Sequence, residues 1–376
     1  MIKHLARGEG YLRPLLVRLP PALAIRLYSQ GRLRVLGLLA HERPLARRVP
    51  DGLGRELWGL RFRSPILNAA GMWKKGDGGL LALRQGAGGF LAGTTTHQER
   101  VGNRRDGVFQ PFAPYPGSGA ASNFLGLPNP GHAAVAPKLR ELRTACPDDF
   151  PIGVSVAAVA EGTRDEADML EKLLDGLRLY EEAGVDFIEL NESCPNTEDG
   201  HGLDALEARL AIIRDGFLER RQRHLPVVLK FSCDTALDQV PGLVDLLLEN
   251  ALDGVNFGNT SVEYDVHRAA IRRSEQALYD DFTSRFGGGV SGRPLKDRSL
   301  VLARAANDHL RTLDGKIPRE FHVLRTGGVE NASDLAASDA AGVSLNQWYT
   351  GYFESFSRHG HNLYRKLYKA YKENKA

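Results

Sequence analysis

Eight short apolar runs, separated by longer segments with helical spacing, constrain the fold of this 376-residue chain more than any other feature. Each run ends in polar residues, which is typical of parallel strands covered on both faces. The predicted strands are Pro65–Ala70, Gly89–Thr96, Ile152–Ala157, Phe187–Asn191, Val227–Ser232, Gly254–Asn259, His322–Thr326 and Val343–Trp348. Helices are predicted between them, for example over Asp165–Ala183, Leu203–His224 and Ala236–Asn250. The pattern predicts an α/β fold, a (β/α)8 TIM barrel, rather than a doubly wound open sheet, which normally has fewer strands.

Two segments interrupt this alternation. Gln98–Pro130 is rich in Gly, Pro and Asn, and long loops of this kind in compact domains are usually functional. Val262–Gly289 follows the sixth strand, and we expect it to form a lid or side elements.

The first 50 residues differ in composition from the rest. They carry a charge of +8, whereas the remainder of the chain carries −5. Leucines alternate with arginines, and Pro20-Pro21 interrupts the segment, so we expect two amphipathic helices. Such helices favour peripheral membrane contact through residues 1–45; the alternative is a helical hairpin packed on the main domain. The predicted division is therefore residues 1–50, a helical extension, and residues 51–376, the barrel.

Several classes are disfavoured. No window approaches 18 uninterrupted apolar residues, so no membrane span is predicted. Because the basic residues are interleaved with leucines, nucleic-acid binding is not expected. The three scattered cysteines, Cys146, Cys194 and Cys233, argue against a disulfide framework and for a reducing compartment, and no metal-ligand spacing is present.

The segment Asn191–Thr197, at the end of the fourth predicted strand, carries the strongest chemical signal. Asn191 and Asn196 bracket Cys194. A pair of carboxamides can donate and accept hydrogen bonds to a planar ring such as a pyrimidine, and a thiol between them is suited to move a proton. The alternative is a polar turn with a helix-capping Asn and a small buried Cys.

Other strand ends add compatible groups. Ala70-Gly71 ends the first strand and would let a planar cofactor approach the backbone, with Lys74 following to pair with a carboxylate. Lys230 places an ammonium group in the barrel mouth, where it needs an anion or a carbonyl. Gly327-Gly328 follows the seventh strand and is typical of a phosphate cradle, although such a pair is often only a turn.

In this order, the motifs resemble those of the dihydroorotate dehydrogenase family, FMN-containing barrel enzymes of pyrimidine synthesis. The resemblance runs from about Tyr11 to the C-terminal region. It rests on the motifs Ala-Ala-Gly-x-x-Lys, Leu-Gly-Leu-Pro-Asn, Asn-x-Ser-Cys-Pro-Asn, Gly-Gly-Val-Ser-Gly-Arg-Pro-Leu and Thr-Gly-Gly-Val.

The resemblance implies a role for each matching position. The implied catalytic base is Cys194, which would remove the C5 proton of dihydroorotate while hydride leaves C6 for FMN. The implied substrate-binding residues are Lys74, Asn123, Leu125, Gly126, Leu127, Asn191, Asn196, Asn259 and Thr260. The implied FMN-binding residues are Ala70, Gly71, Thr94, Ser155, Asn191, Lys230, Gly292, Gly328, Tyr349 and Thr350.

The chain also departs from the family pattern. Quinone-linked members have an N-terminal helical extension but usually a Ser base, whereas soluble members usually have the Cys base and lack the extension. Unusual residues stand at Trp73, Ser155, Gly258 and Arg325, the last where a small residue is common.

The leading hypothesis is therefore quinone-linked oxidation of dihydroorotate at the cytoplasmic side of the inner membrane. The alternatives are the same reaction with fumarate in the cytoplasm, a diverged FMN oxidoreductase acting on another pyrimidine or enone, and a non-enzymatic scaffold. Oligomeric state is not predicted.

Overall fold

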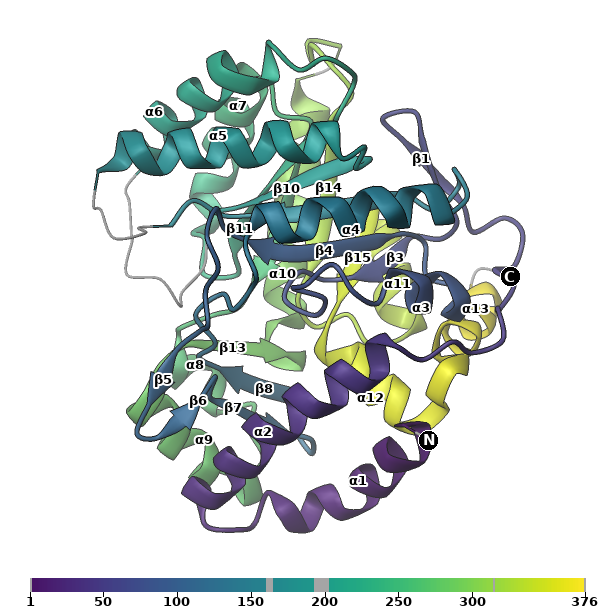
Figure 1. The fold of residues 1–376 in the computed structure, drawn as a ribbon, viewed down its shortest axis with the longest axis vertical. Coiled ribbons are helices and arrows are strands. Elements are labelled where there is room, and N and C mark those ends of the chain that lie inside the picture. The colour runs from purple at the N-terminus through teal and green to yellow at the C-terminus, as the bar shows by residue number, and fades with distance from the viewer. Residues whose placement is uncertain (1, 160–164, 193–202, 314, 375–376) are drawn as a thin grey trace.

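The computed structural model describes residues 2–159, 165–192, 203–313 and 315–374. Its centre is an eight-stranded parallel sheet curled into a barrel (Figure 1), in the order β3-β15-β14-β12-β11-β10-β9-β4. The strands are β3 Ile66–Asn68, β4 Phe90–Thr95, β9 Ile152–Val156, β10 Phe187–Asn191, β11 Val227–Ser232, β12 Gly254–Asn259, β14 His322–Thr326 and β15 Leu345–Trp348. All eight predicted strands are present, and four have the predicted bounds, so the predicted barrel is confirmed.

The seam between β3 and β4 closes the barrel without a regular ladder. The Asn68 amide donates to the carbonyl of Leu91 at 2.7 Å, and the amide N–H of Gly71 donates to the carbonyl of Gly93 at 2.7 Å. The Asn68 side chain therefore takes the place of regular backbone pairing between β3 and β4.

A helix follows each barrel strand and covers the outer face of the sheet. These helices are α3 Gly79–Gln85, α4 His132–Ala145, α5 Glu166–Glu182, α6 Leu203–Ile213, α7 Val240–Glu249, α10 Lys296–Thr312, α11 Ala332–Ala340 and α12 Thr350–His359. Helix α13, Leu363–Glu373, follows α12, and short helical turns occupy Arg214–Leu218, Leu237–Gln239, Arg293–Leu295 and Gly360–Asn362.

The N-terminal end of the barrel is closed by an apolar plug. The hairpin β1 Arg55–Leu57 and β2 Leu60–Phe62 supplies Trp58 and Phe62, which pack with inward-facing Phe187 and Leu324. Because this end is filled, a ligand site is confined to the opposite end, as expected for the fold.

The two inserted segments lie at the open, C-terminal end. Gln98–Pro130, expected to be a long loop, contains β5 Arg104–Arg105, β6 Val108–Phe109, β7 Phe112–Tyr115 and β8 Ala120–Asn123. Val262–Gly289 forms α8 Tyr264–Arg268 and α9 Arg273–Phe286, which confirms side elements. Strand β13, Gly289–Gly292, joins β8 and β7 in a small antiparallel sheet beside the barrel mouth (Figure 1).

The N-terminal extension forms the two expected helices, α1 Ile2–Leu16 and α2 Pro21–Ala40, separated at the prolines. Helix α1 packs on α12, and α2 packs on β7 and α9. Arg13 of α1 forms an ion pair with Glu354 of α12, and Ser29 Oγ of α2 accepts the amide N–H of Phe112 at 3.0 Å. None of the described helices is both long and apolar enough to span a membrane. The division at residue 50 stays a prediction.

Candidate active site

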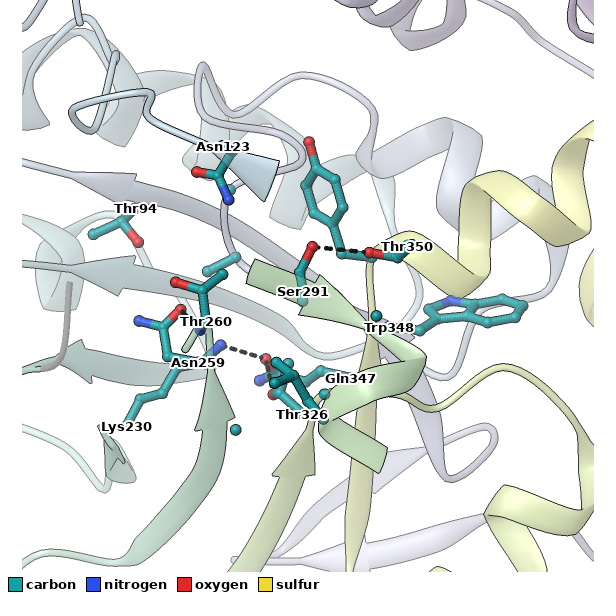
Figure 2. A pocket seen from close by; sticks show the side chains of 18 of the residues that line it. Thr94, Asn123, Lys230, Asn259, Thr260, Ser291, Thr326, Gln347, Trp348 and Thr350 are labelled. Atoms are coloured by element: carbon teal, nitrogen blue, oxygen red, sulfur yellow. Dashed lines mark hydrogen bonds between the residues drawn. The ribbon is translucent and has the colours of Figure 1, made fainter. Parts of the chain in front are cut away.

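A cavity opens among the C-terminal ends of the barrel strands, bounded on its other side by the small antiparallel sheet (Figure 2). Most of the residues predicted from the sequence line this one cavity, although they come from segments spread over 280 residues of chain. The predicted residues in its wall are Ala70, Gly71, Lys74, Thr94, Asn123, Leu125, Leu127, Asn191, Lys230, Asn259, Thr260, Gly292, Gly328, Tyr349 and Thr350.

A chain of hydrogen bonds fixes the amides on one wall. Asn259 Nδ2 donates to Asn191 Oδ1 at 3.0 Å, and Asn191 Nδ2 donates to Thr94 Oγ1 at 3.2 Å. The Thr94 hydroxyl lies 3.0 Å from that of Ser155, which stands behind the wall. Rigid amides of this kind can recognise the alternating donors and acceptors of a planar ring.

Lys230 reaches the floor of the cavity from β11. It is 2% exposed, and its Nζ donates to Gln347 Oε1 at 3.1 Å, as Figure 2 shows, and to Glu189 Oε1 at 3.4 Å. Glu189 is also buried and accepts from Asn256 Nδ2 at 2.8 Å and Gln347 Nε2 at 2.6 Å. Lys230 is thus a buried cation with a built-in counter-ion, not a solvated residue at the end of a strand.

The other end of the cavity suits a phosphate group. Gly292, Gly327, Gly328 and Thr350 line it, and helix α12 begins at Thr350. The N-terminus of a helix presents unpaired N–H groups and a partial positive charge, both of which favour an anion. Ser291 Oγ lies 3.2 Å from Thr350 Oγ1 and joins β13 to this helix start (Figure 2).

Two predicted residues within the described part of the chain do not line the cavity. Ser155 lies behind Thr94, and the carbonyl of Gly126 accepts from Arg100 Nε at 3.3 Å. Two further predicted residues, Cys194 and Asn196, lie outside the described residues.

The unusual residue Gly258 has a steric explanation. Its φ is +120°, and a Cβ atom there would meet the carbonyl oxygen of Thr326 at 1.6 Å. Trp73, another departure, is buried and packs against Gly78 on the outer side of the barrel. Neither departure brings a new side chain into the cavity.

Sequence reasoning missed part of the site. Phe112, Ser291, Leu295, Thr326 and Gln347 line the cavity. The buried pair of Glu189 and Asn256 beneath it was also missed. The signal for Glu189 was present, since a carboxylate inside an otherwise apolar strand needs a buried partner.

The fold and the cavity together define a class: a (β/α)8 barrel whose mouth suits a flat, phosphate-bearing ligand beside an anionic one. The model of the family described as "Dihydroorotate dehydrogenase" matches residues 52–368. This chain belongs to the dihydroorotate dehydrogenase family.

Individual relatives agree with this assignment. A protein of Methylococcus capsulatus named dihydroorotate dehydrogenase (quinone) is 32% identical over 92% of this chain and 94% of its own length. A protein of the same name from Clavibacter michiganensis is 33% identical over 82% and 83%, respectively.

Solved structures agree in fold. The ligand-free DHODH of Eimeria tenella superposes with a TM-score of 0.74 at 20% identity, covering 92% of this chain and 94% of that one. The complex of that protein with ferulenol gives a TM-score of 0.72 at 21% identity, covering 90% and 89%.

Proposed function

We propose that the protein oxidises dihydroorotate to orotate in pyrimidine biosynthesis, with FMN as cofactor and a quinone as electron acceptor. One observation carries the proposal: Lys74, Asn123, Asn191, Asn259 and Lys230 line a single cavity at the barrel mouth. An ammonium at the rim and amides on the walls match a ligand that carries both a carboxylate and a pyrimidine ring. The names of the relatives support the same reaction.

The residues present fit FMN. Thr94, Asn191 and Lys230 would hold the polar edge of its ring, while Ala70, Gly71 and Tyr349 would border it. Gly292, Gly328 and Thr350 would hold its phosphate at the start of α12. When bound, FMN supplies the acceptor for the hydride that leaves C6 of dihydroorotate.

The chain itself would orient the substrate and move one proton. Lys74 would pair with the carboxylate, and Asn123, Asn191, Asn259 and Thr260 would fix the ring in register with the cofactor. Asn196 would contribute another amide. Cys194 Sγ would remove the C5 proton, since a thiolate becomes available after a modest decrease in its pKa.

The N-terminal helices support quinone as the acceptor. Phe112 lines the cavity, and its amide N–H is bonded to Ser29 of α2, so α2 packs directly on the cavity wall. Both helices also carry large exposed apolar side chains, which are Leu5, Tyr11, Leu12, Leu15, Leu23, Leu27, Leu33 and Leu38. Such a surface favours peripheral contact through residues 1–45 with the cytoplasmic side of the inner membrane, where quinone is dissolved.

Anaerobic stopped-flow absorbance tests the proposal. The flavin of the full-length protein should bleach on mixing with L-dihydroorotate, and decylubiquinone should restore its colour faster than fumarate. Lys74→Met should raise the dihydroorotate concentration needed for half-maximal bleaching, whereas the exposed Lys138→Met should not. A flavin-loaded protein that does not bleach would rule out this substrate, and faster recovery with fumarate would rule out quinone as the preferred acceptor.

A further inference from the structure

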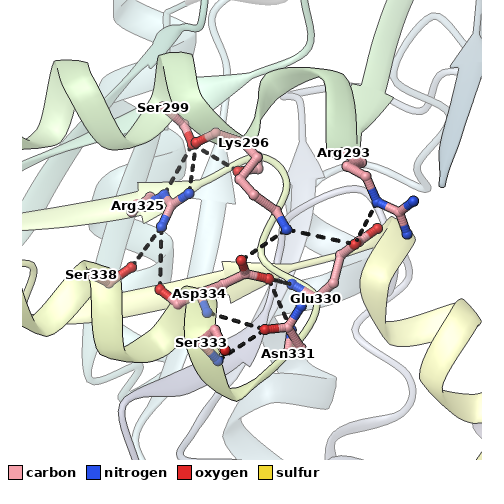
Figure 3. Close-up of polar contacts among 10 residues, drawn as sticks. Arg293, Lys296, Ser299, Arg325, Glu330, Asn331, Ser333, Asp334 and Ser338 are labelled. Carbon is pink, nitrogen blue, oxygen red and sulfur yellow. Dashed lines mark hydrogen bonds and ion pairs between the residues drawn. The ribbon is translucent and has the colours of Figure 1, made fainter. Parts of the chain in front are cut away.

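Arg325 is the last residue but one of β14, and its side chain lies close to Ser299 and Ser338 (Figure 3). Thr326 lines the cavity, and because side chains alternate along a strand, Arg325 points outward beneath α10 and α11. It is 0% exposed. Removing a guanidinium from water costs free energy, and its hydrogen bonds inside the protein must offset that cost.

Within the described residues, Arg325 donates hydrogen bonds to uncharged atoms only. Nε donates to Ser299 Oγ at 3.0 Å, Nη1 to Ser338 Oγ at 2.8 Å, and Nη2 to the carbonyl of Lys296 at 2.7 Å. A weaker bond joins Nη1 to the carbonyl of Asp334 at 3.4 Å. Burial lowers the pKa of Arg325 to about 10, while nearby Asp334 acts against that shift, so the group stays charged at neutral pH.

One of these bonds leads to the phosphate end of the cavity. Ser299 Oγ accepts from Arg325 and donates to the carbonyl of Gly327 at 2.7 Å, closer than its other acceptor, the carbonyl of Lys296, at 3.0 Å. In a trans peptide the C=O and the following N–H point in opposite directions. Because Ser299 holds the Gly327 carbonyl toward α10, the amide N–H of Gly328 points away from α10, and Gly328 itself lines the cavity.

The rest of the turn is held from the other end (Figure 3). Asp334 Oδ2 accepts the amide N–H groups of Glu330 and Asn331 at 2.9 and 3.0 Å, and its Oδ1 pairs with Lys296 Nζ at 2.9 Å. Arg325, acting through Ser299, and Asp334 therefore hold opposite ends of one short segment, residues 327–331. Gly327 and Gly328 have φ values of +96° and +75°, a region that most side chains disfavour, so their orientation depends on such outside contacts.

We infer that Arg325 is a positioning residue for the phosphate end of the cavity: through Ser299 it fixes the Gly327–Gly328 peptide so that its N–H faces a phosphate monoester. The inference rests on the proposed function, in which that phosphate belongs to FMN. Arg325 does not touch the ligand. Its effect is therefore confined to the phosphate end, and it should leave recognition of the ring unchanged.

Riboflavin has the same ring without the phosphate, so comparing it with FMN separates phosphate binding from ring recognition. Dissociation constants for FMN and riboflavin are measured by fluorescence quenching with the full-length, flavin-stripped protein and its Arg325→Met, Arg325→Lys and Ser299→Ala variants. Arg325→Met and Ser299→Ala should each weaken FMN binding about tenfold, the typical effect of losing one hydrogen bond to a charged ligand. Riboflavin affinity should change less than twofold. Arg325→Lys, which keeps a donor, should recover part of the FMN affinity.

Arg298→Gln is the matched control. This arginine also lies on α10, and it donates to the carbonyls of Cys233 and Thr235 instead of to the phosphate turn. It should leave the ratio of the two dissociation constants unchanged. Equal weakening of FMN and riboflavin binding in the Arg325 variants, or a lower Tm with an unchanged ratio of the two dissociation constants, would show that Arg325 contributes only to packing. Either result would overturn the inference.

Ser299→Ala keeps the test decisive if the Arg325 variants do not fold. Failure of the unaltered protein to bind either flavin would instead contradict the proposed function itself, and the inference with it.

Discussion

Glu189 and Lys230 form an ion pair inside the barrel, with Oε1 and Nζ 3.4 Å apart and side chains that are 1% and 3% exposed, respectively. Taking two charges out of water is costly, and the amides of Asn256 and Gln347 offset part of that cost on the carboxylate side. Lys230 lines the floor of the cavity, where it is proposed to hold the polar edge of the flavin ring, and Glu189 lies beneath it.

Glu189→Gln should therefore be strongly destabilising. The substitution leaves the Lys230 charge buried without a counter-ion. It also places an amide group at residue 189 against the amide donors of Asn256 and Gln347. The free energy of unfolding should therefore fall by about 3 kcal/mol. Urea denaturation of the full-length protein measures this change. The double variant Glu189→Gln/Lys230→Met should be more stable than the single variant, because no charge remains unpaired. A double variant less stable than the single one would show that the pair is not coupled in this way.

Gly258→Ala should disrupt the barrel where β12 passes β14. The added Cβ would meet the Thr326 carbonyl oxygen at 1.6 Å in a backbone conformation with φ of +120°, so we expect a loss of more than about 3 kcal/mol or insoluble protein.

Gly242→Ala provides the contrast for that substitution. Apart from the two chain neighbours and the nearby backbone of α7 itself, no atom lies within 4 Å of a Cβ at this position, and Ala favours a helix over Gly by up to about 1 kcal/mol. Gly242→Ala should therefore raise the Tm of the protein. Equal effects of the two substitutions would contradict the steric explanation.

The sequence predicted the barrel well because its signals are local. Val227–Ser232 and Gly254–Asn259 are short apolar runs, and their lengths and polar ends alone define them as buried parallel strands. Residues at the ends of such strands must meet at one end of the barrel, which is why most of the predicted site residues share a cavity.

What the sequence did not predict depends on pairing over long distances. Strand β13 pairs with β8 across more than 160 residues, and no local periodicity encodes that partner. In the same way, the sequence marks Arg325 only as an unusual residue before Thr326, and it takes the packing of α10 and α11 over it to reveal a buried guanidinium. Cys194 and Asn196 lie outside the described residues, so their roles stay predictions.

Stability should decrease at acidic pH partly because of His132. This residue begins α4, is 2% exposed, and its Nε2 is a buried atom without a hydrogen-bond partner in the described part of the chain. Burial, with a smaller contribution from His97, lowers the pKa of His132 to about 3. Below pH 6.5 the unfolded chain takes up a proton that the folded chain excludes, so stability is lost as the pH falls toward 3.

The expected contribution of His132 is about 2 kcal/mol between pH 7.5 and pH 5.0. Urea unfolding at both values should show that His132→Gln loses less stability than the unaltered protein by about this amount. The exposed His4→Gln should keep the original pH dependence. Identical pH dependence in His132→Gln and the unaltered protein would contradict the assignment.

Leu12 and Leu15 should contribute to membrane binding without contributing to folding. They are 54% and 62% exposed on α1, so Leu12→Ser/Leu15→Ser should leave Tm nearly unchanged. Co-sedimentation with vesicles should weaken roughly tenfold or more, because each leucine that enters the bilayer contributes about 1 kcal/mol or more. Val17→Ser, at a buried position of the same segment, should instead lower Tm. Unchanged vesicle binding in the double variant would mean that another surface meets the membrane.

Removal of residues 1–45 should separate the two electron-transfer halves of the reaction. The deletion takes away α2, which packs on the Phe112 wall of the cavity, so turnover with a short-chain quinone should be lost. Reduction of the flavin by dihydroorotate, and turnover with a small artificial dye, should persist because both lysines and all the amides of the cavity lie beyond residue 45. Flavin content and circular dichroism serve as folding controls. Equal loss with quinone and dye in a folded, flavin-loaded protein would mean that the helices support the barrel instead of admitting quinone.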